Sequence, residues 1–320
     1  MARSRGERDR SWPPDPEPLP EPLVDNHTHL DTAAPGAGRF EAVRDGGETA
    51  SGDLGVPSVD DQIARAARVG VTRMVQIGCD LPSARWTDEV VRRHEALLGG
   101  VAIHPNEAPL HAGVHEVGPD GLAPHREDHH DVSLDEAVAQ VAAIAAGNDR
   151  VRVVGETGLD HFRAAERGRA VQREAFRAHI ALAKELGLVL QIHDRDAHEE
   201  VLEVLARDGA PERTVFHCFS GDAAMARHCT DRGWYLSFAG TVTFRGSSAL
   251  REALRAVPLS QVLLETDAPY LAPHPYRGRP NAPYLVAATA RSVATELGID
   301  LGELCRTVSA TSEQVYGPWR

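Results

Sequence analysis

Short apolar segments alternate with polar and amphipathic segments along most of the chain. Eight apolar segments rich in Val, Leu and Ile can be distinguished, at residues 22–31, 71–80, 97–105, 151–160, 188–196, 213–222, 234–240 and 261–270. Their length and composition are typical of buried strands. The pattern therefore predicts eight strands, each followed by a loop and then by a helical segment.

The intervening segments carry helix signals. Ser133 and Glu136 have the spacing of a capping box, and Gly147 follows as a stop signal. Amphipathic periodicity also marks residues 170–187, 196–209 and 247–257. Strands that alternate with helices in this way predict an α/β fold, a (β/α)₈ TIM barrel. A doubly wound open sheet is the alternative, and the number of strands favours the barrel.

Three segments fall outside this repeat. Residues 1–22 contain six prolines, charges of both signs and few apolar side chains, which predicts a disordered Pro-rich tail. Residues 23–320 would then form a single barrel domain. The connections 32–57 and 107–132 are too long for a minimal barrel, and loops of such length are commonly functional insertions or mobile segments.

Composition narrows the possible functions. The 320 residues are 42% hydrophobic and carry a formal net charge of −13, which argues against a general affinity for DNA or anionic membranes because that affinity comes from Lys and Arg. No apolar run predicts a membrane span and no secretory signal is visible, so we expect a cytoplasmic protein. Four cysteines without C-x-x-C spacing predict reduced thiols rather than a zinc knuckle or disulfides.

Residues with metal-ligand chemistry occupy the C-terminal ends of six predicted strands. They are His27, His29, His104, Glu156, His193, His217 and Asp267. His27 and His29 are two residues apart, so they face the same side of a strand. In a barrel all these strand ends open on one face, where active sites are built. The sequence therefore predicts that these side chains converge.

Each of these residues also has an ordinary structural interpretation. A lone strand-end histidine such as His193 is commonly a hydrogen-bonded structural group, Asp267 can start a turn before Ala-Pro, and Glu156 can cap a helix. However, burying several unpaired carboxylates and imidazoles at strand ends costs several kcal/mol for each group. A shared metal centre removes that cost, so the set as a whole favours metal binding.

The number of candidate ligands indicates two divalent metal ions. We expect His27, His29 and Asp267 to hold one ion and His193 and His217 to hold the other, with Glu156 as the bridge. Nitrogen and carboxylate ligands without thiolate suit Zn²⁺, Mn²⁺ or Fe²⁺, and a carboxylate-rich half can accept Mg²⁺. Two such ions can lower the pKa of a shared water, which is the chemistry of a hydrolase.

Six ordered motifs resemble the signatures of one family. The segments DNHTHLD, AIHPNEA, VVGETGLDHF, QIHDRDA, FHCFSGD and LLETDAPYLAP are similar to those of the TatD-type metal-dependent deoxyribonucleases of the amidohydrolase superfamily. The resemblance implies a (β/α)₈ fold and hydrolysis of DNA phosphodiester bonds, often from the 3′ end. It also implies the same six metal ligands, with His104 as a contact to the substrate phosphate. Asn106 departs from the pattern, because many members have a second histidine there.

We expect three catalytic residues, Glu156, Asp267 and His104. A metal-activated water attacks phosphorus, and the ions and His104 stabilise the added charge. Asp267 is the candidate general base, although a purely structural role as a ligand is an equal alternative. Glu265, two residues before Asp267, is predicted to support a ligand histidine from deeper in the barrel.

Several residues near the strand ends are candidate substrate contacts. Arg195 and Arg277 can bind phosphate, with ordinary solvated arginines as the alternative. Tyr270 and Tyr276 can stack on bases, although packing is the commoner role of loop tyrosines. The expected partner is a DNA substrate, in particular single-stranded ends, and the expected oligomeric state is a monomer.

Five further histidines lie in the long connection 107–132, and we expect a different role for them. His111, His115, His125, His129 and His130 can bind additional metal, but exposed polar residues in a flexible loop are the preferred interpretation.

Two other functions remain alternatives. The first is an amidohydrolase, lactonase or phosphoesterase that acts on small molecules with the same dinuclear core. A lysine at the end of the fourth strand would favour that class through carbamylation, but Glu156 stands there. The second is a catalytically idle metal-binding protein, which would predict losses among the six ligands, and all six are present.

Overall fold

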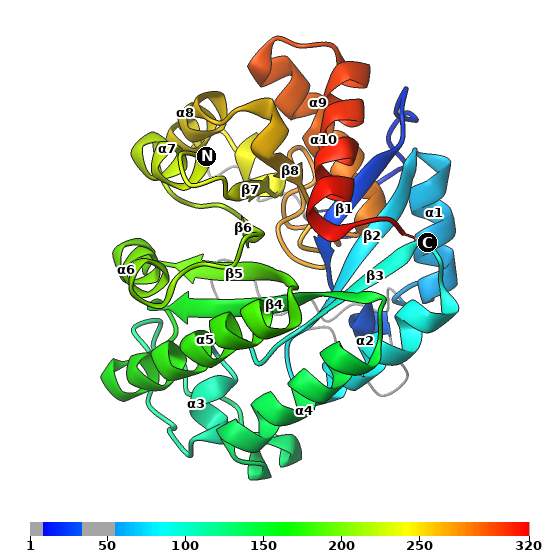
Figure 1. The fold of residues 1–320 in the computed structure, drawn as a ribbon. Helices are drawn as coiled ribbons and strands as arrows, with labels where there is room; N and C mark the ends of the chain where they lie inside the picture. The colour runs from blue at the N-terminus through cyan, green and yellow to red at the C-terminus, as the bar shows by residue number, and fades with distance from the viewer. Residues whose placement is uncertain (1–8, 34–54, 320) are drawn as a thin grey trace, which may run out of the picture.

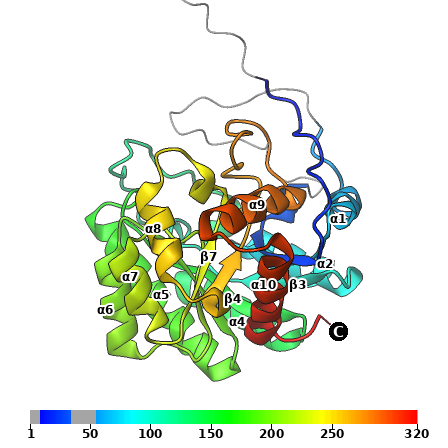
Figure 2. The ribbon, with the colours of Figure 1, turned by 90° about the horizontal axis from the view of Figure 1, so that it is seen from above.

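The computed structural model describes residues 9–33 and 55–319, and it contains one parallel sheet of eight strands in sequential order. Its strands are β1 (Leu23–Thr28), β2 (Val71–Gly78), β3 (Leu97–Val101), β4 (Val151–Asp160), β5 (Val189–Arg195), β6 (Thr214–Phe216), β7 (Tyr235–Phe238) and β8 (Val262–Leu264). Helices surround the strands in both views (Figures 1 and 2). Each strand lies within one of the eight predicted segments, so the predicted (β/α)₈ barrel is confirmed.

The first and last strands, β1 and β8, approach each other at their C-terminal ends. Thr28 forms a parallel bridge with Ala268, which follows β8. The His29 amide donates to the Ala268 carbonyl at 2.7 Å, and the Asp267 amide donates to the His27 carbonyl at 3.0 Å. These bonds close the barrel on the face where the strands end, and they place His27 and His29 beside Asp267.

Helices follow most strands and pack outside the barrel. They are α1 (Val59–Arg68), α2 (Leu81–Arg93), α3 (Ala108–His111), α4 (Leu134–Gly147), α5 (Glu166–Leu186), α6 (His198–Asp208), α7 (Ala223–Thr230), α8 (Ser248–Ala256), α9 (Val286–Leu297) and α10 (Leu301–Tyr316). Ser133 caps α4 by accepting from the Glu136 amide. Gly187 ends α5 in the left-handed conformation, with φ of 63°, which glycine adopts without a Cβ penalty.

Alternation along the strands separates two apolar cores. Outward residues such as Leu190 and Leu264 pack against the helices, whereas Val189, Val215 and Leu263 pack inside the barrel. Because successive side chains face opposite sides, the inward positions of β5 continue from Val189 to Gln191 and His193. The interior is therefore apolar where the strands begin and polar where they end.

The C-terminal segment closes the end of the barrel where the strands begin. Val315, Tyr316 and Trp319 belong to the inner apolar core. Arg213, which precedes β6, donates to the Val315 carbonyl at 2.9 Å, and Arg150, which precedes β4, donates to the Trp319 carbonyl at 3.3 Å. The C-terminal segment therefore fills the end of the barrel where the strands begin.

The expectation of a disordered tail over residues 1–22 is wrong for residues 9–22, and residues 1–8 lie outside the described part of the chain. In Figure 2 this segment, in dark blue, runs past α1 toward α10. The Leu19 side chain is buried, and its amide donates to the Val69 carbonyl at 2.9 Å. The Tyr284 hydroxyl donates to the Pro13 carbonyl at 2.7 Å. A proline-rich, extended chain is held here by contacts that the barrel supplies.

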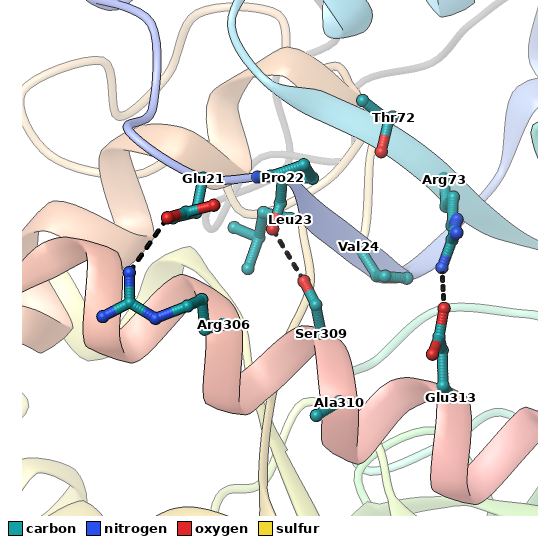
Figure 3. Close-up of a pocket in the computed structure, with 10 residues that line it drawn as sticks. All are labelled: Glu21, Pro22, Leu23, Val24, Thr72, Arg73, Arg306, Ser309, Ala310 and Glu313. Carbon is teal, nitrogen blue, oxygen red and sulfur yellow. Dashed lines mark hydrogen bonds and ion pairs between the residues drawn. The ribbon is translucent and has the colours of Figure 1, made fainter.

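A hollow of about 360 Å³ lies between the start of β1, β2 and α10 (Figure 3). Ion pairs cross it, from Glu21 to Arg306 at 2.9 Å and from Arg73 to Glu313. Its lining contains no histidine or cysteine. Because the hollow lies where the strands begin, it is at the opposite end from the predicted ligands, and we assign it no role.

The structure bears differently on the predictions for the two long connections. Within 32–57, residues 34–54 fall outside the described residues, so the prediction for this segment remains a prediction. The 107–132 segment contains α3 and a 3₁₀ turn at Asp128–Asp131, and it buries His111 and His130. The expectation of five exposed histidines is therefore wrong for these two, whereas His115 and His125 are exposed.

Among the described residues, none of the helices has the length and the apolar character that crossing a bilayer would require.

Candidate metal centre

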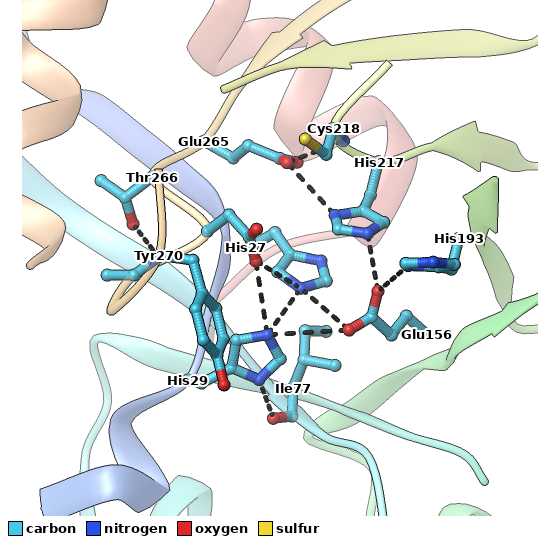
Figure 4. A network of polar contacts seen from close by, with 12 residues as sticks. His27, His29, Ile77, Glu156, His193, His217, Cys218, Glu265, Thr266 and Tyr270 are labelled. Carbon is cyan, nitrogen blue, oxygen red and sulfur yellow. Dashed lines mark hydrogen bonds and ion pairs between the residues drawn. The ribbon is translucent and has the colours of Figure 1, made fainter. Parts of the chain in front are cut away.

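The predicted ligands converge at the end of the barrel where the strands finish (Figure 4). His27, Glu156 and His217 are buried, and the side chains of His29, Asp267 and His193 are 10%, 12% and 18% exposed. These residues come from segments as far apart in sequence as β1 and the loop after β8. The structure thus brings together all six residues that the sequence predicted as metal ligands.

Four side-chain atoms form one cage. The Nε2 atoms of His27 and His29 lie 3.1 Å apart, and each lies 3.4–3.8 Å from Oε1 of Glu156 and Oδ1 of Asp267. Metal–ligand bonds of about 2.0–2.2 Å place the ligand atoms of a tetrahedral site about 3.3–3.6 Å apart. The cage therefore has the dimensions and the donor types of a divalent-cation site.

Hydrogen bonds on the far side of each ring set the tautomers in this cage. His27 Nδ1–H donates to Oε1 of Gln191 at 2.7 Å, and His29 Nδ1–H donates to the Ile77 carbonyl at 3.1 Å. Because Nδ1 of each ring is engaged as a donor, Nε2 is the atom that each ring presents to the cage. This is the arrangement that a metal-binding imidazole requires.

A second cage lies on the other side of Glu156. Its Oε2 atom is 2.6 Å from Nε2 of His217 and 3.2 Å from Nδ1 of His193. The two oxygens of one carboxylate thus face different pairs of histidines (Figure 4). Glu156 therefore lies between the two histidine pairs, and its role as a bridge between two cations stays a prediction.

Two carboxylates orient the histidines of the second cage. Glu265, which is fully buried, accepts from His217 Nδ1 at 3.2 Å, so that Nε2 faces Glu156. Asp160, at the end of β4, accepts from His193 Nε2 at 3.1 Å, so that Nδ1 faces Glu156. Partners of this kind hold a metal-binding ring in place and raise its basicity. Glu265 lies where the sequence predicted.

Electrostatics make the same positions attractive to cations. Burial disfavours charge on Glu156, but the adjacent His217 outweighs it and holds the pKa of this carboxyl well below its usual range. Burial also opposes charge on His29 and His193, yet the adjacent carboxylates raise the pKa of each to about 9. A cation that binds here would displace the protons that these imidazoles hold beside the carboxylates.

His104 lies beside the cages with a different hydrogen-bonding arrangement. Its Nδ1 accepts from the Asn106 amide at 3.0 Å, and its Nε2 lies 3.8 Å from Oε1 of Glu156. Burial lowers its pKa to about 4, so the ring is neutral. Because Nδ1 accepts, Nε2 carries the proton. His104 is thus a hydrogen-bond donor that faces the centre.

The predicted substrate contacts have exposed side chains, with Arg195 at the end of β5 and Tyr270 and Arg277 in the segment that follows β8. Arg195 is exposed, and its guanidinium stacks 3.9 Å from the Phe162 ring. Arg277 is also exposed and lies over Phe244 at 4.7 Å. Tyr270 is 42% exposed, with its ring 6.1 Å from that of His29.

Three residues around the centre were not identified from the sequence. Gln191 orients His27, Asp160 orients His193, and the Cys79 thiol lies 3.4 Å from Oε1 of Glu156. Gln191 precedes His193 by two residues, so the strand period could have placed it inside the barrel. Asp160 ends β4, but the pairing of β4 with β5 shifts register between Val154 and Thr157, so simple alternation does not place its side chain, and Cys79 follows the end of β2.

The barrel and its carboxylate-linked histidine cages define the class, a metal-dependent barrel hydrolase. A family model described as TatD related DNase matches residues 24–317. An uncharacterized metal-dependent hydrolase, TatD, from Mycobacterium tuberculosis is 38% identical over 299 residues, covering 92% of this chain and 98% of the relative. The corresponding YabD protein from Bacillus subtilis is 30% identical over 259 residues, with 81% and 92% covered. The chain therefore belongs to the TatD family of metal-dependent hydrolases.

A solved structure supports the fold. The crystal structure of YJJV, a TatD homologue from Escherichia coli, superposes with a TM-score of 0.74 at 21% identity, covering 92% of this chain and 98% of that one. At this identity the likeness bears on the barrel architecture alone.

Proposed function

We propose that this hydrolase cleaves phosphodiester bonds at the 3′ ends of single-stranded DNA. The observation that carries the proposal is the Glu156 carboxylate, whose two oxygens face two separate histidine pairs. Divalent cations held in this way, of the Zn²⁺, Mn²⁺, Fe²⁺ or Mg²⁺ type, would lower the pKa of a shared water and offset the charge that develops on a phosphate. The match to a model described as TatD related DNase supports DNA as the substrate.

The residues around the cages support a strand end as the substrate. The ligands are recessed, and the chain carries a net charge of −13, which disfavours a long contact with duplex DNA. A single-stranded end needs only local contacts. Arg195 and Arg277 can bind backbone phosphates, and the exposed ring of Tyr270 beside His29 can stack on a base. Since all these residues belong to one chain, a monomer is a sufficient functional unit.

The side chains of the centre have distinct proposed roles. His104 donates from Nε2 to a phosphate oxygen, and this bond strengthens as charge develops in the transition state. Asp267 takes the proton of the attacking water, or else only holds a cation. Asp267→Asn separates these roles when metal occupancy is verified: a loss of turnover with an altered pH profile supports the base, and unchanged turnover rules it out.

The test uses metal-replete protein and single-stranded DNA labelled at either end. Digestion from the 3′ end releases a labelled mononucleotide at once from the 3′-labelled strand and produces a descending ladder from the 5′-labelled strand. Glu156→Gln, prepared identically, shows whether a contaminating nuclease is responsible. A panel of lactones, amides and phosphomonoesters runs in parallel. Hydrolysis of the small molecules without cleavage of DNA overturns the proposal.

A further inference from the structure

A second cluster of imidazoles lies in the 107–132 segment, apart from the ligands of the catalytic centre. The rings of His129 and His130 have centroids 4.0 Å apart, and the His111 ring lies 5.0 Å from that of His130. One ligand atom from each of the three histidines lies within 4.8 Å of the others. The Glu107 carboxylate belongs to the same cluster, because its Oε2 lies 2.7 Å from Nε2 of His130 and 3.4 Å from Nε2 of His129.

His111 supplies an unpartnered lone pair. Its Nδ1–H donates to the Val132 carbonyl at 2.7 Å, so the lone pair is on Nε2. The His111 residue is only 6% exposed, and Nε2 has no hydrogen-bond partner. A buried acceptor without a partner is costly in a folded protein. Its neighbours in the cluster are two further imidazoles, which are themselves ligand groups.

Glu107 supplies a negative charge one helical turn away. The His111 amide bonds to the Glu107 carbonyl in α3, so the two side chains are four residues apart on the same side of one turn. His130 Nε2–H donates to Glu107, and the Glu127 amide donates to His130 Nδ1, which fixes that tautomer. His130 is thereby a positioning residue that orients the carboxylate. His129, at 15% side-chain exposure, faces the same carboxylate from the rim.

We propose that His111, His129 and Glu107 bind a divalent transition metal ion, of which Zn²⁺ is the type, at an auxiliary site oriented by His130. Two imidazole nitrogens and one carboxylate oxygen are a donor set that Zn²⁺ accepts, with water as a fourth ligand. The His130–Glu107 hydrogen bond is the kind of outer contact that such sites use. The site depends on neither the DNA substrate nor the catalytic cages.

The position of the cluster suggests what the ion does. His111 and His129 lie near the two ends of the insertion, so one ion ties these ends together and reduces the freedom of the segment between them. Glu107 follows directly on Asn106. The side-chain NH₂ of Asn106 donates to Asp160 at 3.1 Å, and its backbone amide donates to Nδ1 of His104. The ion thus holds the segment that carries His104 beside the catalytic centre.

The test counts zinc equivalents. Parent protein and a His111→Ala/His129→Ala variant are dialysed to equilibrium against buffered free zinc, and bound metal is measured by mass spectrometry. The matched control is His115→Ala/His125→Ala, which removes two exposed histidines from the same segment. We expect the first variant to lose one equivalent per chain and the control to lose none. Equal zinc content in the two variants overturns the site.

A second measurement does not depend on the folding of a variant. Crystals of the parent protein grown with zinc are measured on both sides of the zinc absorption edge. An anomalous peak about 2.0–2.2 Å from His111 Nε2, His129 and Glu107 supports the site. A map with peaks at the catalytic cages alone overturns it and leaves the proposed function standing. Zinc at the auxiliary site in a protein that fails to cleave DNA would support the auxiliary site and overturn the proposed function.

Discussion

Asp160 provides a sharp test of how the centre is organised, because it contacts a proposed ligand without being one. Its Oδ2 accepts from His193 Nε2 and from Asn106 Nδ2, both at 3.1 Å, and its Oδ1 accepts from the Arg163 amide at 2.9 Å. An asparagine has one oxygen and cannot satisfy all three donors. If its NH₂ group faces His193, the ring must move its proton to Nδ1, which is the atom that faces Glu156.

The expected magnitude follows from this conflict. Loss of a partner that orients a metal-binding histidine reduces metal affinity by about 10- to 100-fold, or about 1.4–2.8 kcal/mol. If the asparagine instead turns its oxygen toward His193, the Arg163 amide faces a donor, which costs roughly 1–3 kcal/mol of folding stability. Asp160→Asn is therefore predicted to weaken metal binding at the second cage, to destabilise the fold, or to do both.

The assay is a competition titration of metal-free protein with a chromophoric chelator, together with denaturant unfolding in the absence of metal. Asp194→Asn is the matched control. Asp194 lies next to His193 on β5, and its side chain is only 5% exposed. Its Oδ2 pairs at 2.8 Å with Nδ1 of His198, which is not a proposed ligand. We expect this control to bind metal like the parent. Parental affinity and parental stability in Asp160→Asn would refute the reasoning.

Three further predictions concern other parts of the molecule. Burial lowers the pKa of His179 from 6.5 to about 4. Between these values the unfolded chain binds more protons than the folded protein, so the free energy of unfolding falls by roughly 3 kcal/mol as the pH decreases through this range. In the presence of chelator, His179→Gln should flatten the profile of unfolding free energy against pH, and a profile parallel to that of the parent would contradict this. Tyr284→Phe removes the bond to Pro13 and should cost about 1 kcal/mol in urea unfolding, whereas parental stability would show that the N-terminal segment contributes nothing through this contact. Arg195→Ala should raise KM for single-stranded DNA and reduce the slope of log affinity against log salt by about 0.7, and an unchanged slope would exclude a phosphate contact.

Much of the fold and the convergence of the ligands could be predicted because both depend on simple periodicities. Buried strands appear as apolar segments, and in a parallel barrel the end of each strand faces the same opening. His193 and Asp267 could therefore be placed together although they lie in different parts of the sequence. Glu265 followed from the two-residue period of a strand.

Other features depend on contacts that no local pattern encodes. Residues 9–22 have the composition of a disordered segment, but Tyr284 and Val69, from elsewhere in the chain, supply their hydrogen bonds. His111 and His130 lie in a polar insertion, and they are buried because that insertion folds against itself through Glu107 and Val132. Tertiary contacts of this kind override composition.

The central claim is that Glu156 joins two cation sites at the mouth of the barrel. The most direct measurement is a crystal structure of the metal-replete protein with anomalous data at the absorption edge of the bound metal. Our interpretation predicts two peaks about 3.5–4 Å apart, one beside His27, His29 and Asp267 and the other beside His193 and His217, with one oxygen of Glu156 on each. A single peak, or two peaks that do not share Glu156, would contradict it.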